Sequence, residues 1–436
     1  MGKHAGDTAA GIFAPWLSPR PPEADEPWNR QPVSEAVLRD TLYRAVDTAM
    51  QRSPEVQQAQ ANLDAAMADV DEARGHRWPS LQIGTQSRAL AVGSHSDNNP
   101  SRDPSLTLAV VTPVYDFGRT GNVIKSREQS AEATSQAYEA EREKIASVVC
   151  IALVELGKQR TLIYVGQQYV DRLNALVRML GEIVKVDNGR MSELIQAKAR
   201  LLQAQANLDA TLASAREAEL ALRKLLGDTH PTLPAGQAWT LKPASVDDLL
   251  PQLDAHPLLQ QARAEAAAAR YYADSVKSAA WPSLNWIISK NTGRDAIGRE
   301  QPWETRLALN WTAFSGGSVH ASKVAALARA SASEQHEAQL HLDTEYQVRA
   351  AAQDAQTLAD RANAYRDLAD ETEQVRRAFF EQWYHLGRRT LLDVLTAESD
   401  YYGNQVNEVS YRYDGYLAVL REYASAGQLV AWLRHP

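Results

Sequence analysis

The tetrapeptide Trp-Pro-Ser-Leu occurs twice in this chain, at residues 78–81 and again at residues 281–284. In both copies an alanine-rich run precedes it and an alternation of apolar and polar residues follows it. Proline has no N–H and disfavours the α conformation in the residue before it, so a helix is expected to end at each Trp-Pro. The repeat therefore predicts two similar halves, each with a helix followed by a strand.

Four segments alternate between apolar and polar residues with the period of two that is typical of a β-strand. They lie at about 80–91, 105–115, 283–291 and 304–312. We expect the apolar positions to face lipid, and they are Leu81, Ile83, Leu106, Leu108, Leu284, Trp286, Leu307 and Leu309. We expect the polar positions to face a lumen, and they are Gln82, Asn285, Arg306 and Asn310.

Four strands are too few to close a barrel on their own, since membrane barrels begin at about eight strands. An open sheet edge cannot lie in lipid, because its N–H and C=O groups would have no hydrogen-bond partner. Either several subunits complete one barrel, or the strand pairs are soluble caps on a coiled coil. The apolar faces, which include Trp286 and Trp311, favour the membrane.

A very long helix is predicted from about Arg119 to Val186, where the sequence contains no proline. Apolar residues recur there at every seventh position: Val149, Leu156, Ile163, Val170, Val177 and Val184. A strict seven-residue repeat is typical of a helix packed along a supercoiled seam. At about 1.5 Å per residue this helix would be roughly 100 Å long.

The predicted organisation has five parts. They are an extended, proline-rich N-terminal arm (1–32), a first repeat (33–227) with a helical hairpin at 119–227, a linker or small equatorial subdomain (228–256), a second repeat (257–424) with a helical hairpin at 318–424, and a C-terminal tail (425–436). The sequence contains no run of 18 apolar residues, so no transmembrane helix is predicted.

Charge and cysteine content exclude some classes of protein. The net charge of −8 gives no support to a nucleic-acid partner, and the single cysteine, Cys150, rules out an intrachain disulfide. Residues 1–32 lack a cationic start followed by an apolar core, so no signal peptide is visible. Either the protein is cytosolic, or this is the mature form of an exported chain given a new Met1, and the predicted strands favour the second.

Together, the two halves, their Trp-Pro-Ser-Leu segments, the Phe-Gly turns and the segment 384–398 (YHLGRRTLLDVLTAE) resemble the TolC family of outer-membrane efflux and secretion channels. The likeness covers about residues 38–425. It implies a chain that is mainly α with a membrane β-barrel part. In a homotrimer, each protomer would give four strands to a twelve-stranded barrel in the bacterial outer membrane and four helical segments to a long periplasmic α-barrel.

The same resemblance implies the exit duct of a tripartite export system. Its partners would be a periplasmic adaptor (membrane fusion) protein, an inner-membrane ABC transporter or other pump, outer-membrane lipid, and exported protein or small molecules. The return helix at 391–402 is more similar to members that serve type I protein secretion than to those that serve drug pumps. Multidrug efflux is an alternative, and a soluble coiled-coil scaffold or adaptor is an alternative of another class.

The sequence contains no readable nucleophile–base set, so an enzyme is not expected, and neither a metal nor a cofactor is predicted. The candidate functional residues are instead two acids at the predicted hairpin ends, Glu193 and Asp393. Aligning Ala197 with Ala397 places Glu193 opposite Asp393, each in the first turn of a return helix, where a carboxylate is favoured by the helix dipole. By residue type alone they are solvated acids, with Asp393 able to pair with Arg389 at i,i+4.

The resemblance implies more for these positions. It assigns a periplasmic gate to Tyr384, Arg389, Asp393, Glu193 and Arg190. The tyrosine, the arginine of the second hairpin and the acids match family positions whose links between neighbouring hairpins hold the channel entrance shut. Thr396 stands where some members carry a second acid, which implies a single acidic ring at that level and leaves strong block by cations in doubt.

Overall fold

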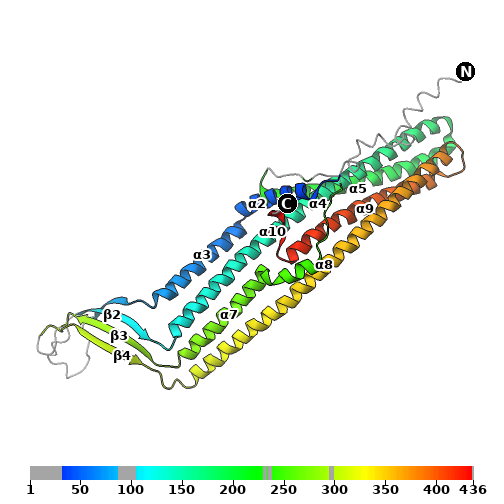
Figure 1. The fold of residues 1–436 in the computed structure, drawn as a ribbon. Coiled ribbons are helices and arrows are strands. Elements are labelled where there is room, and N and C mark those ends of the chain that lie inside the picture. Colours follow the sequence, from blue (N-terminus) through cyan, green and yellow to red (C-terminus); the bar gives the residue numbers. More distant parts are fainter. Residues whose placement is uncertain (1–31, 87–104, 229–232, 234–237, 294–298, 435–436) are drawn as a thin grey trace. The chain divides into compact units, whose positions relative to one another are not determined.

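The computed structural model describes residues 32–86, 105–228, 233, 238–293 and 299–434, and the chain forms two compact units (Figure 1). Unit 1 comprises Met1–Val56, Glu141–His256 and Asp343–Pro436, and unit 2 comprises Gln57–Ala140 and Pro257–Leu342. Each unit takes segments from both sequence repeats. The reason is that the two longest helices, α4 (Arg119–Val186) and α8 (Ser318–Tyr384), each run from one unit into the other.

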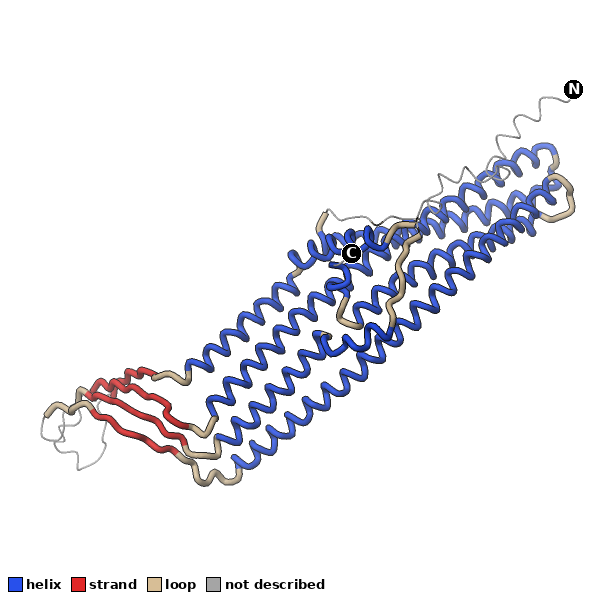
Figure 2. The backbone as a smooth tube through the Cα atoms, viewed as in Figure 1, coloured by secondary structure: helices blue, strands red, loops and turns tan. Residues whose placement is uncertain are grey.

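Unit 2 contains one antiparallel sheet with the strand order β1-β2-β3-β4 (Figure 2). Its strands are β1 (Ser80–Gln86), β2 (Ser105–Tyr115), β3 (Ser283–Asn291) and β4 (Glu304–Asn310). Helix α3 (Pro54–Gly75) leads into β1, and α7 (Pro257–Ser278) leads into β3. Both helices end shortly before a Trp-Pro, in agreement with the loss of an N–H donor at proline.

Two strand ends differ from the sequence prediction. The strand expected at 80–91 is described only as far as Gln86, and the residues from 87 to 104 lie outside the described residues. The strand expected at 304–312 ends at Asn310. Asn310 lies opposite Ser283, the first residue of β3, and the preceding Pro282 has no N–H with which to extend the pairing.

The two β-hairpins have the same register, which confirms the internal repeat. Leu81 lies opposite Val110 in the first hairpin. In the second, Leu284, which is 203 residues after Leu81, lies opposite Leu309, which is 199 residues after Val110. All other pairs of β1 with β2 reappear between β3 and β4 with the same two offsets, from Ser80–Val111 to Gln86–Ser105.

The turns that follow β2 and β4 are also equivalent. Each contains two successive residues in the left-handed region, Phe117 and Gly118 at φ 56° and 83°, and Gly316 and Gly317 at φ 59° and 86°. The phenylalanines of these two turns, Phe117 and Phe314, are therefore not equivalent and differ in position by two residues. The backbone makes Phe314 the equivalent of Tyr115, because the positive-φ positions of the two turns must coincide.

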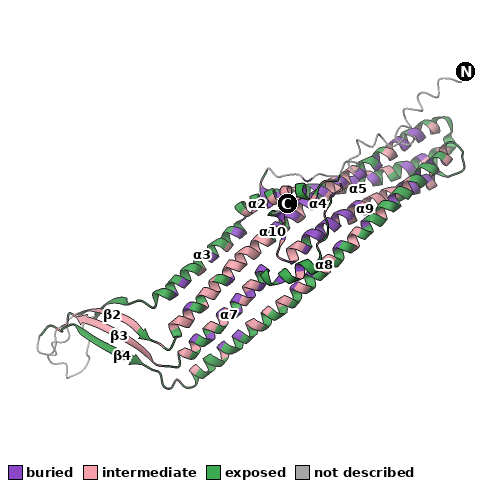
Figure 3. Ribbon diagram, viewed as in Figure 1, coloured by how far each residue is buried: buried purple, intermediate pink, exposed green. Residues whose placement is uncertain are grey.

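Unit 1 is a bundle of helices in which buried positions recur along each helix (Figure 3). Besides parts of α4 and α8 it contains α2 (Glu35–Arg52), α5 (Met191–Leu226), α9 (Leu391–Ser425) and α10 (Leu429–Arg434). The predicted seven-residue repeat of α4 is its core stripe, with Val149, Leu156, Val170 and Val184 buried and Ile163 and Val177 partly buried against the core. No helix in the described part of the chain is long and apolar enough to cross a membrane.

Two regions of unit 1 have more structure than the sequence predicted. The linker contains α6 (Val246–Leu249) and the 3₁₀-helix η4 (Leu250–Ala255), and the C-terminal tail contains α10. The ends of α10 are buried through Leu429 and Leu433, and the Leu429 and Val430 amides donate hydrogen bonds to Glu143. These elements are too short for periodicity to reveal them.

Candidate functional site

The first helical hairpin ends in a short turn organised by Asp187. The Asp187 carboxylate accepts a hydrogen bond of 3.0 Å from the Gly189 amide and caps the 3₁₀-helix η3 (Asn188–Arg190). Arg190 Nε lies 3.8 Å from Asp187 Oδ2, and Arg190 Nη1 lies 3.9 Å from Glu193 Oε2. Glu193 is in the first turn of α5 (Met191–Leu226). One Glu193 oxygen is enclosed and has no hydrogen-bond partner among the described residues, so this carboxylate is held by charge alone.

The second hairpin ends with a capping box. Gly387 turns the chain in the left-handed region at φ 58°, and Thr390 then caps α9. The Thr390 amide and hydroxyl each donate to the Asp393 carboxylate at 3.0 Å, and the Asp393 amide donates back to the hydroxyl at 3.2 Å. These two donors, the amide first, lower the pKa of Asp393, so its charge persists to lower pH than usual.

Arg389 and Asp393, which are able to pair at i,i+4, do not form an ion pair in the described part of the chain. The Asp393 carboxylate instead accepts hydrogen bonds from Thr390, which is the N-cap residue of α9 and is closer along the chain than Arg389. Arg389 instead donates from Nε to Gln382 at 3.2 Å, and its guanidinium lies 4.1 Å from the centre of the Phe379 ring. Arg389 is thus held against the last turns of α8.

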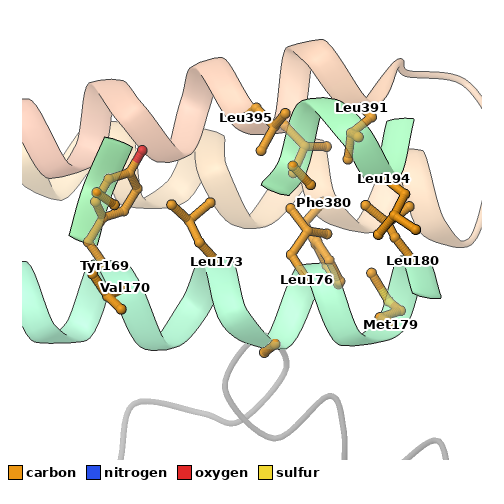
Figure 4. Packing of buried hydrophobic residues seen from close by; sticks show 14 of the residues in the cluster. Tyr169, Val170, Leu173, Leu176, Met179, Leu180, Leu194, Phe380, Leu391 and Leu395 are labelled. Atoms are coloured by element: carbon orange, nitrogen blue, oxygen red, sulfur yellow. The ribbon is translucent and has the colours of Figure 1, made fainter. Parts of the chain in front are cut away.

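A single hydrophobic cluster packs the two hairpin ends together. Leu176 of α4, Leu194 of α5, Phe380 of α8 and Leu391 of α9 all belong to it (Figure 4). Ala197 and Ala397, which the sequence alignment made equivalent, are both buried in this cluster. The ring of Tyr384 is half-buried against it and stacks on Phe380 with 6.0 Å between ring centres.

The structure therefore brings the five predicted gate residues to two neighbouring hairpin ends of unit 1. In the single chain, the described contacts of Arg190 and Glu193 stay within the first hairpin, and those of Arg389 and Asp393 stay within the second. The core fixes the helices, while the charged groups remain partly or fully exposed.

A buried charge cluster behind these ends was missed by sequence reasoning. Glu398 of α9 has no exposed surface, and it accepts hydrogen bonds from Arg172 Nε of α4 at 3.0 Å and Arg376 Nη1 of α8 at 2.8 Å. Arg376 also binds Glu373 at 2.7 Å. The signal was present, because Glu398 follows Leu391 by seven residues and so lies on the buried stripe of its helix.

Arg376 of this cluster keeps its charge despite its burial. Burial alone disfavours the charge on Arg376, but the carboxylates of Glu398 and Glu373 outweigh it and raise the pKa of the guanidinium. The Tyr401 ring lies between the two arginines, 5.3 Å from the Arg172 guanidinium and 5.6 Å from that of Arg376. Buried ion pairs between Arg172, Arg376 and Glu398 thus join the helices α4, α8 and α9.

The sheet of unit 2 separates apolar from polar residues by face. In an antiparallel sheet, residues directly opposite each other lie on the same face. By the observed register, one face carries Leu81, Ile83, Leu106, Leu108, Leu284, Trp286, Leu307 and Leu309. The other carries Gln82, Asn285, Arg306 and Asn310.

The apolar face of the sheet is open to the surroundings in the single chain. Ile83 is 67% exposed and Leu309 is 68% exposed. The Trp286 indole N–H is satisfied by the Thr305 hydroxyl at 2.7 Å, so this side chain presents no unpaired donor. An exposed face that carries many apolar side chains marks an interaction surface, for protein or for lipid.

A family model described as outer membrane efflux protein matches residues 45–228 and 252–428. Protein CyaE from Bordetella pertussis is 26% identical over 288 residues, which are 63% of this chain and 57% of that protein. The chain thus spans less than two thirds of the length of this relative.

Solved structures are similar to the chain over most of its length. VceC from Vibrio cholerae has a TM-score of 0.77 at 20% identity, covering 88% of this chain and 96% of that one. The CmeC outer membrane channel from Campylobacter jejuni has a TM-score of 0.78 at 15% identity, covering 89% and 86%. The open MtrE channel from Neisseria gonorrhoeae has a TM-score of 0.75 at 18% identity, covering 90% of each. These matches confirm the predicted fold class.

Proposed function

Because the chain belongs to the outer membrane efflux protein family, whose members are channels rather than enzymes, we propose that it is the exit duct of a type I protein secretion system. In this role it receives an exported protein from a periplasmic adaptor and an inner-membrane ABC transporter. It releases that protein through the outer membrane. Family membership also confirms the resemblance to TolC and the expectation that the chain is not an enzyme.

The observation that carries the channel function is the sorting of the sheet into an apolar and a polar face. A sheet with lipid on one side and water on the other needs this pattern. The sheet has two edge strands, β1 and β4, whose outer N–H and C=O groups need partners in a membrane. Three copies together supply twelve strands, enough to close a barrel with no free edge.

The choice of protein secretion over drug efflux is supported by α9. Its segments 391–395 and 397–402 resemble those of secretion channels. Deleting the gene tests this choice. We expect a large protein to disappear from the culture medium while susceptibility to small toxic compounds stays unchanged. Unchanged secretion together with increased susceptibility would instead establish multidrug efflux.

The gate is proposed to lie at the two hairpin ends of unit 1. Threefold symmetry turns each of the five gate residues into a ring. In this proposal Arg389 and Tyr384 hold one hairpin to a neighbouring hairpin of the trimer through hydrogen bonds, those of Arg389 being charge-assisted. The carboxylates of Asp393 and Glu193 supply a negative field at the mouth.

Removing the arginine and the tyrosine hydroxyl should open the entrance. For the variant Arg389→Ser with Tyr384→Phe, we expect a severalfold higher single-channel conductance in a planar lipid bilayer, because the links between hairpins are lost. Arg388→Ser is the matched control, since it removes a neighbouring exposed arginine. Wild-type conductance in the double variant, or an equal rise in the control, would contradict the assignment of this gate.

Neutralising the acids should weaken the preference for cations. Asp393→Ala removes both a charge and a helix cap, so Asp393→Asn, which keeps an oxygen that can accept from the Thr390 amide, isolates the charge. We expect a reduced cation-to-anion permeability ratio from reversal potentials, and a further reduction when Glu193→Ala is added. Because the pKa of Asp393 is lowered, wild-type selectivity should persist to a more acidic pH than that of an ordinary carboxylate ring. Unaltered reversal potentials in all three variants would place the constriction elsewhere.

A further inference from the structure

A cavity of about 610 Å³ lies in unit 2, where the helices of the first repeat meet the sheet. It is formed between the end of α3, with the residues that lead into β1, and the first turns of α4. An ion pair of 2.8 Å between Arg74 and Glu128 joins these two segments. The other residues that line the cavity are Arg77, Trp78, Gly121, Ile124 and Lys125.

The charges around this cavity are mostly positive. It is lined by three cations and one carboxylate, Glu128, which is already paired with Arg74. Among the described residues, no acid pairs with Arg77 or Lys125. Lys125 Nζ instead lies 5.5 Å from the centre of the Tyr271 ring of α7, a contact that leaves its charge in place. Two cations without a neighbouring acid make the cavity suitable for an anion.

The second repeat has the same backbone at this place but not the same charges. Helices α3 and α7 begin 203 residues apart and have the same length, and α4 and α8 begin 199 residues apart. With these offsets, Ala280 takes the place of Arg77 and Val324 takes the place of Lys125. The equivalent junction thus folds without these two cations, so the fold itself does not require them.

Gly121 keeps the space beside the two cations open. A Cβ added to Gly121 would lie 3.5 Å from Arg77 Nη2, so the guanidinium faces the bare backbone of α4. Lys125 is four residues further along α4 and lies on the same face of the helix. The second repeat has His320 in place of this glycine. A larger side chain at position 121 would occupy the space in which an anion can contact Arg77.

The surroundings of the cavity favour a lipid headgroup as the anion. Trp78 is 74% exposed beside it, and β1 begins two residues later with Leu81 and Ile83 exposed on the apolar face. In a membrane channel this junction is where the sheet leaves the lipid, and tryptophan is enriched at such interfaces. Basic pockets beside membrane-spanning elements bind the headgroups of anionic lipids.

We propose that this cavity binds the phosphate group of an anionic phospholipid through Arg77 and Lys125. The Trp78 ring packs against the glycerol of the lipid, and the acyl chains lie along the exposed apolar residues of β1. Arg74 keeps the Glu128 carboxylate paired, which limits its repulsion of the phosphate. This inference rests on the channel of the proposed function, because it requires the sheet to stand in a membrane.

Native mass spectrometry of the full-length protein in detergent tests this proposal. The protein is titrated with dioleoyl phosphatidylglycerol, and the lipids that remain bound are counted per chain. For the variant Arg77→Gln with Lys125→Gln, we expect the affinity for the first lipid on each chain to fall roughly 25-fold. Each cation near an anionic headgroup contributes about fivefold to the affinity, and two are removed.

Two control variants and a competitor separate a defined site from general attraction between charges. Lys277→Gln with Lys323→Gln removes two exposed lysines from the equivalent junction of the second repeat and should leave the affinity close to the wild-type value. Gly121→Gln keeps every charge but fills the cavity, so it should weaken binding severalfold. Inorganic phosphate at the concentration of the lipid should displace little of it, because it has no acyl chains to contact the sheet.

Each outcome decides the proposal. Weaker binding in the 77/125 variant and in the 121 variant, with the 277/323 variant unchanged, supports it. Wild-type binding in either of the first two variants overturns it, and so does an equal loss in the 277/323 variant. Full displacement by inorganic phosphate also overturns it, because the ligand would then be a soluble phosphate ion.

The proposed function is decided separately by the unaltered protein. If it is not a trimer in the same spectra, or forms no pore in a planar lipid bilayer, the channel function fails, whatever number of lipids each chain retains. If it is a trimer and forms a pore but retains no phosphatidylglycerol, the channel function stands and the lipid site is overturned.

Discussion

Replacing Glu398 with alanine should lower the free energy of unfolding of unit 1 by about 3–5 kcal/mol, the cost of leaving a buried charge without its partner. Glu398 is fully buried, and its two partners, Arg172 and Arg376, are 11% and 5% exposed. The variant leaves two guanidinium groups short of a carboxylate in a place that water does not reach. Denaturant unfolding followed by circular dichroism measures this effect.

A matched control shows whether burial is the cause. Glu219 of α5 bonds Arg160 of α4 at 3.1 Å, and both side chains are at least one-third exposed. Glu219→Ala should therefore cost no more than about 1 kcal/mol. Equal losses from Glu398→Ala and Glu219→Ala would show that the buried cluster has no special role. Adding Arg172→Met to Glu398→Ala should recover part of the loss, because Arg172 is left without its carboxylate in the single variant, whereas Arg376 keeps Glu373.

Replacing Trp286 with arginine should prevent the sheet from entering a membrane. Trp286 is in the middle of β3 on the apolar face, opposite Thr112 and Leu307. An arginine on the lipid face costs about 2–4 kcal/mol near the middle of the bilayer. We expect a marked loss of trimer in outer-membrane fractions. Leu108→Arg should behave alike, with added repulsion from Lys290, which lies directly opposite.

The neighbouring residue gives the control for this prediction. Asn285 lies on the other face of β3, opposite Pro113 and Ala308. Asn285→Arg should leave trimer assembly close to the wild-type level, because this face is proposed to line the aqueous lumen. If the two arginine variants assemble equally well, the assignment of the faces to lipid and lumen is wrong.

The sequence was sufficient to predict the features that rest on a periodic pattern of apolar residues. The alternation around Leu81 and Leu284 placed the residues on the observed faces, and the seven-residue spacing from Val149 predicted the core stripe of α4. Both patterns follow from backbone geometry, so each added residue strengthens the prediction. Trp-Pro correctly marked the change from helix to strand because proline acts on its immediate neighbour.

Features decided by a choice between partners could not be predicted from the sequence. Asp393 had two candidate donors nearby, and the helix start selected Thr390 over Arg389. Glu398 follows the apolar spacing, but its arginines come from helices that are distant in sequence. The equivalence of Phe117 with Gly316 rather than Phe314 depends on backbone φ angles, which side-chain identity does not reveal.

The two β-hairpins also differ in one respect that bears on how this protein can be altered. Their strands pair identically, yet the offsets of 203 and 199 residues mean that the chain between the paired residues Gln86 and Ser105 is four residues longer than the chain between the equivalent residues Ser289 and Glu304. The extra length changed no strand pair, since closing a longer loop costs little additional entropy. The connection between Gly293 and Glu304, which follows the last residues of β3, is therefore the place where a grafted peptide, such as an epitope for surface display, is expected to leave the sheet intact.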